Sequence, residues 1–186
     1  QHHISADLMK CREGILKAYK SGVFLLLICG GYQLMGKYYR DADGSEIKGL
    51  GLFDYYTVAP ASRRKRCIGN IVIETQKTGV PVKVVGFENH GGQTVGVKSP
   101  FGKVLCGNGN CSKSENEGYC EKNVIATYLH GPLLAKNPEI SDHIIGYCMQ
   151  RKLNAGGSAE KYELPKLDDT LEIKCRSVML ERLLKK

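Results

Sequence analysis

The most restrictive feature of this chain is a strand–turn–helix pattern around residue 29. Residues 23–28 are apolar at every position, which is typical of a short strand covered on both faces. Cys29-Gly30-Gly31 follows, and residues 32–39 are predicted to form a short helix. A tight glycine turn between a buried strand and a helix is the architecture of a nucleophile elbow. The pattern therefore predicts an α/β fold with a cysteine at the end of a strand.

The remaining pattern also mixes helices with strands. An amphipathic helix is predicted over residues 5–20, a turn at 41–44, strands at 51–58, 68–74, 82–88 and 124–129, and a helix from 138 to about 151. The last helix, at about 168–186, has Leu171, Ile173, Val178, Leu180 and Leu184 as its apolar members. A chain of 186 residues can bury one good core. We therefore expect a single domain over residues 1–186, with the C-terminal helix packed on it.

Composition limits the classes of partner. The formal net charge of +8 favours anionic partners, but no zinc-finger, RNP-type or helix-turn-helix signature accompanies it, so we expect no nucleic acid. No apolar run approaches the roughly 20 residues that span a bilayer, and no charged-then-apolar leader opens the chain, which favours the cytoplasm. The first residue is Gln1 rather than methionine, which indicates a processed or truncated piece.

Cys29 and His130 are the candidate catalytic pair. A cysteine at a helix N-terminus meets backbone donors and positive potential, which favour the thiolate, and the N–H of Gly30 is a natural oxyanion donor. His130 also follows a predicted strand, before Gly131 and Pro132. Taken singly, each has an alternative interpretation, as a buried structural cysteine and as a hydrogen-bonded structural histidine. Their occurrence at two strand ends favours a thiolate–imidazolium pair that hydrolyses amides.

These segments resemble a known family. Residues 28–36 (Ile-Cys-Gly-Gly-Tyr-Gln-Leu-Met-Gly) resemble the nucleophile motif of class I glutamine amidotransferases of the CobB/CobQ type, and residues 127–134 with Asn137 and Pro138 resemble the histidine motif. Residues 86–92 (Gly-Phe-Glu-Asn-His-Gly-Gly), the loop 107–110 and the tail 164–184 are more narrowly similar to the GatD-type glutaminase subunits of lipid II isoglutaminyl synthases. The resemblance covers almost all of the chain.

The resemblance implies a fold and a mechanism. The fold would be flavodoxin-like, a three-layer α/β arrangement with a mostly parallel central sheet. Cys29 would attack the side-chain amide of glutamine, and His130 would protonate the departing ammonia. Gly30 and Gly31 would form the oxyanion turn, and Gln33 matches the motif glutamine that shapes the pocket.

The resemblance also implies substrate-binding residues. A substrate-holding arginine has its best match in Arg66, although Arg63 and Arg64 are close enough to leave the assignment open, and a solvated basic loop is the alternative for the run. Asn89 and His90 would lie beside the glutamine pocket, or form a structural turn. No metal is expected, because Cys106, Cys111 and Cys120, with His90 as a conceivable fourth ligand, lack the paired spacing of zinc sites.

A partner is implied as well. GatD-type glutaminases form a heterodimer with a Mur-ligase-like subunit, MurT, which would hold ATP and Mg²⁺ and amidate the D-glutamate α-carboxylate of lipid II. No cofactor is then expected in this chain, which lacks a P-loop. The alternatives are a cobyric acid synthase-type amidotransferase domain of cobalamin biosynthesis, and a catalytically weak docking module.

Two departures from the family pattern matter. Many class I relatives have a glutamate where this chain has Pro132, so the group that orients His130 is not identified by the sequence. Gln1 falls at the end of a glycine-rich loop that helps form the oxyanion hole in relatives. A protein that started there would lack one donor, at a cost of about 2.7–4 kcal/mol in transition-state stabilisation.

Overall fold

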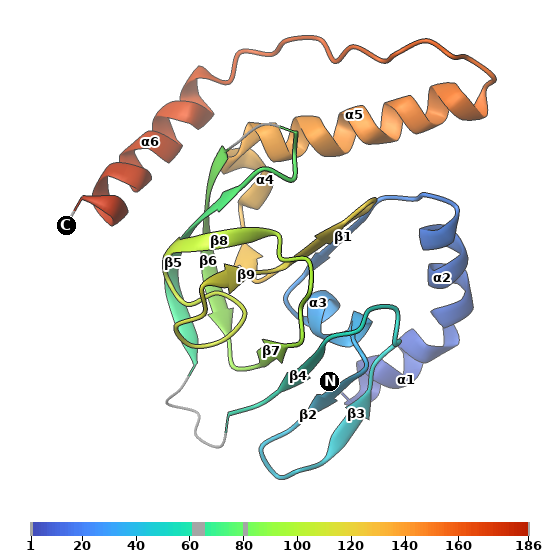
Figure 1. Cartoon of the computed structure of the whole chain (residues 1–186), viewed down its shortest axis with the longest axis vertical. Coiled ribbons are helices and arrows are strands. Elements are labelled where there is room, and N and C mark those ends of the chain that lie inside the picture. The colour runs from blue at the N-terminus through green and yellow to red at the C-terminus, as the bar shows by residue number, and fades with distance from the viewer. Residues whose placement is uncertain (1, 61–65, 80–81, 186) are drawn as a thin grey trace.

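A computed structural model describes residues 2–60, 66–79 and 82–185 (Figure 1). Its helices are α1 (His2–Lys10), α2 (Arg12–Lys20), α3 (Gly30–Met35), α4 (Leu133–Lys136), α5 (Pro138–Ala155) and α6 (Thr170–Leu184). Its strands are β1 (Leu25–Ile28), β2 (Tyr38–Arg40), β3 (Glu46–Lys48), β4 (Tyr56–Val58), β5 (Cys67–Thr75), β6 (Val82–His90), β7 (Gln93–Val95), β8 (Gly102–Cys106), β9 (Asn116–Glu117), β10 (Tyr119–Glu121), β11 (Val124–Thr127) and β12 (Leu129–His130). The predicted α/β class is confirmed.

Strand β1 lies between two helical layers. It pairs with β11 in parallel, in a register that runs from Leu25 opposite Val124 to Ile28 opposite Thr127. Leu26 and Ile28 belong to one apolar cluster with Ile125 and with α5, whereas Leu25 and Leu27 belong to another with α2 and α3. Because both faces of the strand are covered, every position must be apolar, which is the pattern that the sequence shows.

The sheets are less parallel than expected. The described strands form three sheets, in the orders β1-β11-β10, β12-β6-β5-β8-β9 and β3-β2-β4-β7, and only the β1–β11 and β2–β4 pairs are parallel. The five-stranded sheet is antiparallel throughout. Its two long strands, β5 and β6, are separated only by residues 76–81, and a connection that short joins neighbours in antiparallel fashion. The expected mostly parallel central sheet is therefore wrong for the described residues.

Helix α6 contacts α4 and the strands β5, β6 and β8 after an extended segment that follows α5 (Figure 1). Its buried residue is Arg176, whose guanidinium forms an ion pair with both carboxylate oxygens of Glu139 on α5. Four of the five predicted apolar members are exposed instead: Leu171 is 76% exposed, Ile173 45%, Val178 44% and Leu184 36%. The predicted helix is present as α6, but its buried contact is a charged pair and most of these apolar residues stay exposed. No described helix has both the length and the apolar character that crossing a bilayer requires.

Candidate active site

Cys29 lies on a sharp turn between β1 and α3. Its N–H donates to the carbonyl oxygen of Thr127 at 2.9 Å, which extends the β1–β11 ladder, and its own carbonyl accepts from the N–H of Gln33 at 3.0 Å. The backbone has φ 51° and ψ −102°. A positive φ is uncommon for a residue other than glycine and marks a conformation imposed by its surroundings. Strand, strained cysteine and helix together form the predicted elbow.

The electrostatic setting of the Cys29 thiol combines opposing effects. Partial burial raises its pKa, while the backbone N–H of Gly30 and the positive charge of Arg66 lower the pKa but do not cancel the rise. A Cβ atom built at Gly30 would meet nothing within 4 Å, so the turn leaves room beside its N–H. A thiol with a raised pKa is mainly protonated at neutral pH, so this cysteine needs a nearby base to act as a nucleophile.

His130 lies just beyond the carboxyl end of β11, the strand that pairs with β1, and belongs to β12 of the five-stranded sheet. Thr127, the residue opposite Ile28 in the parallel pair, is three positions before it, and His130 itself pairs with Phe87 of β6. Nδ1 of His130 lies 3.1 Å from the carbonyl oxygen of Phe87. A carbonyl oxygen can only accept, so the proton of a neutral imidazole resides on Nδ1 and the lone pair on Nε2 is left available. This backbone carbonyl is an orienting group that the sequence did not identify.

Arg66, the candidate substrate-binding arginine, forms a hydrogen bond with Asn89, which was also predicted to lie at the glutamine pocket. Arg66 precedes β5, and its Nη2 donates to Oδ1 of Asn89 at 2.9 Å. A Cβ atom at Gly91 would lie 3.4 Å from Nη1 of Arg66, so the glycine permits the guanidinium to lie close to the backbone. The structure thus brings Arg66 and Asn89 together. Arg63 and Arg64 lie outside the described residues.

A hollow of about 590 Å³ opens beside this arginine. Its lining residues are Tyr39, Asp41, Ala42, Asp43, Ala59, Pro60, Arg66 and Gly91. The charge of Arg66 acts on the thiol of Cys29 as well as on the phenol of Tyr39. The hollow is therefore within electrostatic reach of the nucleophile, and it is large enough for an amino acid.

Gln33 and His90 form a buried layer and do not line the hollow. Gln33 is 3% exposed and donates through Nε2 to the hydroxyl of Tyr128 at 3.1 Å. His90 is 2% exposed and stacks on the Tyr128 ring, with centroids 3.6 Å apart and planes 5° from parallel. Its Nδ1 lies 2.7 Å from the carbonyl oxygen of Gly92. Its Nε2 has no hydrogen-bond partner in the described part of the chain and lies 3.8 Å from Oε2 of Glu88.

Two glutamates, Glu88 and Glu117, are buried. The resemblance had pointed to the segment that contains Glu88, whereas the sequence did not single out Glu117. Glu117 accepts hydrogen bonds from the hydroxyl of Thr127 and the N–H of Tyr128, and its complete burial raises its pKa to about 8. Burial also opposes ionisation of Glu88, but the nearby His90 ring and the hydrogen bonds from Asn108 and Gly109 outweigh that effect and lower its pKa. A single glutamate in a polar, glycine-rich segment is ordinarily exposed, so no sequence pattern marks Glu117.

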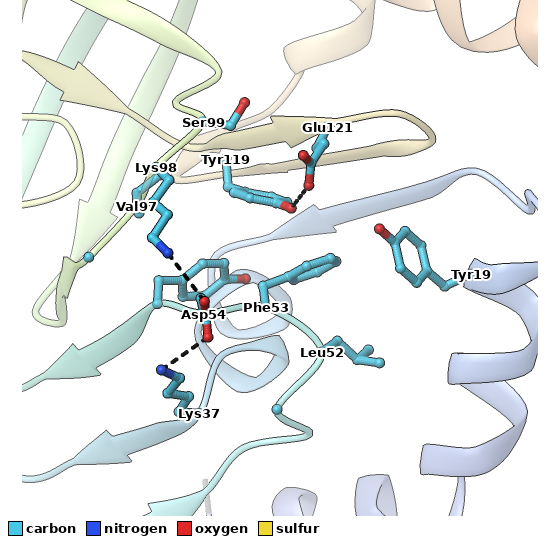
Figure 2. A pocket seen from close by; sticks show the side chains of 13 residues that line it. Tyr19, Lys37, Leu52, Phe53, Asp54, Val97, Lys98, Ser99, Tyr119 and Glu121 are labelled. Carbon is cyan, nitrogen blue, oxygen red and sulfur yellow. Dashed lines mark hydrogen bonds and ion pairs between the residues drawn. The ribbon is translucent and has the colours of Figure 1, made fainter.

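A second hollow, of about 320 Å³, contains none of the predicted site residues (Figure 2). It is lined by Tyr19, Lys37, Gly51, Leu52, Phe53, Asp54, Tyr55, Gly96, Val97, Lys98, Ser99, Tyr119 and Glu121. The carboxylate of Asp54 lies between the ammonium groups of Lys37, at 3.1 Å, and Lys98, at 3.4 Å. The hydroxyl of Tyr119 donates to Glu121 at 2.5 Å. These polar groups already pair with one another.

The cysteines do not gather into a metal centre. In the described ranges, no three or more His, Cys, Asp or Glu side chains are arranged to hold a metal ion. Cys120 is instead buried in an apolar cluster with Ile73 and Phe101. All eight cysteines are among the described residues, and none forms a disulfide. The structure therefore gives no support to the zinc alternative.

Comparison with known proteins identifies the family. Residues 1–138 match the model of the CobB/CobQ-like glutamine amidotransferase domain. The lipid II isoglutaminyl synthase (glutamine-hydrolyzing) subunit GatD of Staphylococcus aureus (strain N315) is 39% identical over 176 residues, which cover 95% of this chain and 68% of that protein. The same-named subunit of Streptococcus pneumoniae (strain ATCC BAA-255 / R6) is 34% identical, with 92% and 63% covered. A probable cobyric acid synthase of Methanococcus maripaludis (strain C5 / ATCC BAA-1333) is 33% identical, but the match covers 80% of this chain and only 32% of that protein. The chain spans about two thirds of its GatD relatives, and it belongs to the CobB/CobQ-like glutamine amidotransferase family.

Proposed function

We propose that this chain hydrolyses glutamine to glutamate and ammonia for a separate synthetase subunit. One observation carries the proposal: Cys29 directly follows β1, and His130 lies three residues beyond Thr127, the last residue of β11, so the two residues follow the carboxyl ends of a parallel strand pair. In this proposal, residues 1–186 form one domain with a flavodoxin-like three-layer fold, and the strands β1 and β11 belong to its central layer.

The first half of the reaction forms a thioester. Nε2 of His130 takes the proton of the Cys29 thiol, and the sulfur attacks the side-chain carbonyl carbon of glutamine. The N–H of Gly30, at the glycine turn with Gly31, donates to the oxyanion that develops. The C–N bond then breaks while the imidazolium returns its proton to nitrogen, so ammonia leaves as a neutral molecule.

The second half releases glutamate. Nε2 of His130 accepts a proton from water, whose oxygen attacks the thioester carbonyl, and the sulfur of Cys29 leaves and is reprotonated. Both halves require the same tautomer, with the proton of the neutral ring on Nδ1. The hydrogen bond to the carbonyl of Phe87 favours that tautomer and supports the assignment.

Arg66 would bind the α-carboxylate of glutamine. Its hydrogen bond to Asn89 leaves further guanidinium N–H groups for a carboxylate, since an arginine has five donors. Gln33 and His90, buried beneath Tyr128, would support the pocket from behind rather than touch the substrate.

We further propose that ammonia is delivered to a Mur-ligase-like subunit, MurT, in a heterodimer. That subunit would hold ATP and Mg²⁺ and amidate the D-glutamate α-carboxylate of lipid II in peptidoglycan biosynthesis. The reaction would take place in the cytoplasm, where glutamine and ATP are available. The names and coverage of the two GatD relatives support this assignment.

The second candidate is the amidotransferase domain of a cobyric acid synthase, and the third is a docking module with weak catalysis. The coverage of the relatives favours the first proposal over the second. Probable cobyric acid synthases match over about a third of their length, as expected for a domain fused to a larger enzyme.

A glutaminase assay on the assembled complex tests the proposal. Glutamate and ammonia release are compared for the unmodified protein, Cys29→Ala and the control Cys148→Ala, which changes an exposed cysteine on α5. Only Cys29→Ala should abolish release, and mass analysis of the stem peptide should show amidation that depends on Cys29. Activity that survives in Cys29→Ala overturns the mechanism, while amidation of a cobyrinate acceptor would favour the second candidate.

A further inference from the structure

Glutamine carries a carboxylate and an ammonium group at its α-carbon, and Arg66 can pair only with the carboxylate. We propose that Asp41 is a specificity-determining residue whose carboxylate binds the α-ammonium group of glutamine. The inference rests on the proposed glutaminase function and concerns a second charged residue of the same hollow.

The backbone of Asp41 is fixed at the neck of the turn between β2 and β3. Its N–H donates to the carbonyl oxygen of Ser45 at 2.8 Å, and its carbonyl accepts from Gly44 at 3.0 Å. Oδ1 accepts from the N–H of Ala42 at 2.7 Å. The remaining oxygen, Oδ2, has no hydrogen bond or ion pair in the described part of the chain. The turn therefore presents a preorganised carboxylate oxygen at the hollow.

The neighbouring carboxylate is differently engaged. Asp43 lines the same hollow, but its Oδ1 accepts from the N–H of Ser45 at 2.8 Å, and its side chain has a further interaction. Both acidic residues lie on one turn, yet the side chain of Asp43 has this further interaction, whereas that of Asp41 has only the hydrogen bond to Ala42 among the described residues. This difference makes Asp43 a matched control for charge and position.

Opposite charges face the hollow without neutralising each other. Tyr39, Asp41 and Arg66 all line the hollow. Burial raises the pKa of the Tyr39 phenol, and the charges of Asp41 and Arg66 act on this pKa in opposite directions. No ion pair joins Asp41 to Arg66 among the described residues, and Arg66 donates instead to Asn89. The space between an unpaired anion and a cation suits a small zwitterion, whose own two charges lie within about 4 Å of one another.

The nucleophile lies within electrostatic range of the same groups. The charge of Arg66 acts on Cys29 as well as on Tyr39, and Cys29 itself acts on Tyr39. With its α-carbon held between Asp41 and Arg66, glutamine can extend its side-chain amide toward the sulfur. A carboxylate at Asp41 thus selects α-amino acids over simple ω-amides.

The test is a comparison of glutamine with glutaramate, the same molecule without its α-amino group. Steady-state hydrolysis by the assembled complex is measured for the unmodified protein, Asp41→Asn and Asp43→Asn. Asparagine keeps an oxygen for Ala42 but loses the charge. Because Asp41 is exposed, we expect a loss of about tenfold in kcat/KM for glutamine, mainly through KM. Glutaramate hydrolysis should be unchanged, so the preference for glutamine collapses.

Two outcomes overturn the inference. If Asp41→Asn keeps the glutamine-to-glutaramate preference of the unmodified protein, or if Asp43→Asn loses it equally, Asp41 is not the ammonium-binding residue. Cys29→Ala measured in parallel separates this failure from that of the proposed function. Glutamine hydrolysis that is absent from the unmodified protein, or that persists without Cys29, overturns both. Hydrolysis that depends on Cys29 with an unchanged preference overturns the Asp41 assignment alone.

Discussion

Nδ1 of His130 lies 3.1 Å from the main-chain carbonyl oxygen of Phe87, on the neighbouring strand of an antiparallel pair. This contact does for the imidazole what a carboxylate does in a Ser-His-Asp triad, because it fixes the ring and its tautomer. A main-chain carbonyl carries no full charge, so it stabilises the imidazolium less than a carboxylate would. In the proposed mechanism, Cys29 and His130 therefore act as a dyad whose orienting group is neutral.

Substitution of His130 tests the role of that ring. His130→Ala removes the only proposed proton carrier, and we expect kcat for glutamine hydrolysis to fall by about 10²–10⁴-fold. Ammonia release is the measurement, and His143→Gln, a change on α5, is the control that should leave it unaltered. A kcat for His130→Ala close to that of the unmodified protein would exclude the histidine from proton transfer.

The raised pKa of Cys29 predicts its reactivity toward an alkylating agent. The thiolate is the reactive form, so alkylation by iodoacetamide should keep increasing with pH above the range in which an ordinary cysteine titrates. Arg66 lowers this pKa, so Arg66→Gln should move the profile to higher pH. Peptide mass spectrometry distinguishes Cys29 from exposed cysteines such as Cys148. A profile shifted to lower pH by Arg66→Gln would contradict the electrostatic assignment.

Glu117 predicts that stability depends on pH. Its pKa is about 8 in the folded protein and about 4.3 when unfolded, so between these values the folded state holds a proton that the unfolded state releases. The contribution is complete below pH 4 and is lost as the pH rises through 8, by at most about 1.4 kcal/mol per pH unit. Urea unfolding at pH 5, 6.5 and 8 should show a smaller pH dependence for Glu117→Gln. Parallel curves for the two proteins would refute the prediction.

The ion pair between Arg176 and Glu139 predicts how α6 is attached. Arg176→Met leaves the partly buried carboxylate of Glu139 without its partner, and we expect a loss of about 1–3 kcal/mol in the free energy of unfolding. That is below the cost for a fully buried pair, because the Glu139 side chain remains 31% exposed. Adding Glu139→Gln should recover part of the loss. Additive effects in this double-mutant cycle would mean that the two side chains do not interact.

Local signals in the sequence were sufficient for several elements. The strand at residues 68–74 appears as β5 and the strand at 82–88 as β6, because alternation and β-branched residues act over a few positions. The elbow at Cys29 was predictable for the same reason. The helix expected over residues 5–20 is instead divided between α1 and α2 at Cys11, a break that no glycine or proline announces. Strand pairing was predicted less well, since register and direction depend on contacts between distant segments.

The candidate site also combines residues that local sequence motifs predict with residues whose roles depend on long-range contacts. Cys29 and His130 carry short motifs, whereas Glu117 and Asp41 owe their settings to long-range packing and to a turn that faces another part of the chain. His90 illustrates the converse, because its motif suggested the pocket and the structure buries its ring against Tyr128. Sequence alone does not tell whether a polar side chain points into a pocket or into the core.

The acceptor that orients His130 belongs to the main chain, so no substitution of a side chain removes it. The side chain of Phe87 is 39% exposed. It can therefore be substituted while the main-chain carbonyl keeps its hydrogen bond to His130. What must persist through evolution is the alignment of β6 with β12, since a shift by one residue would turn that carbonyl away. If the proposed dyad operates, selection on its histidine therefore acts on how two strands are aligned, and the exposed side chains of β6 can change without loss of catalysis.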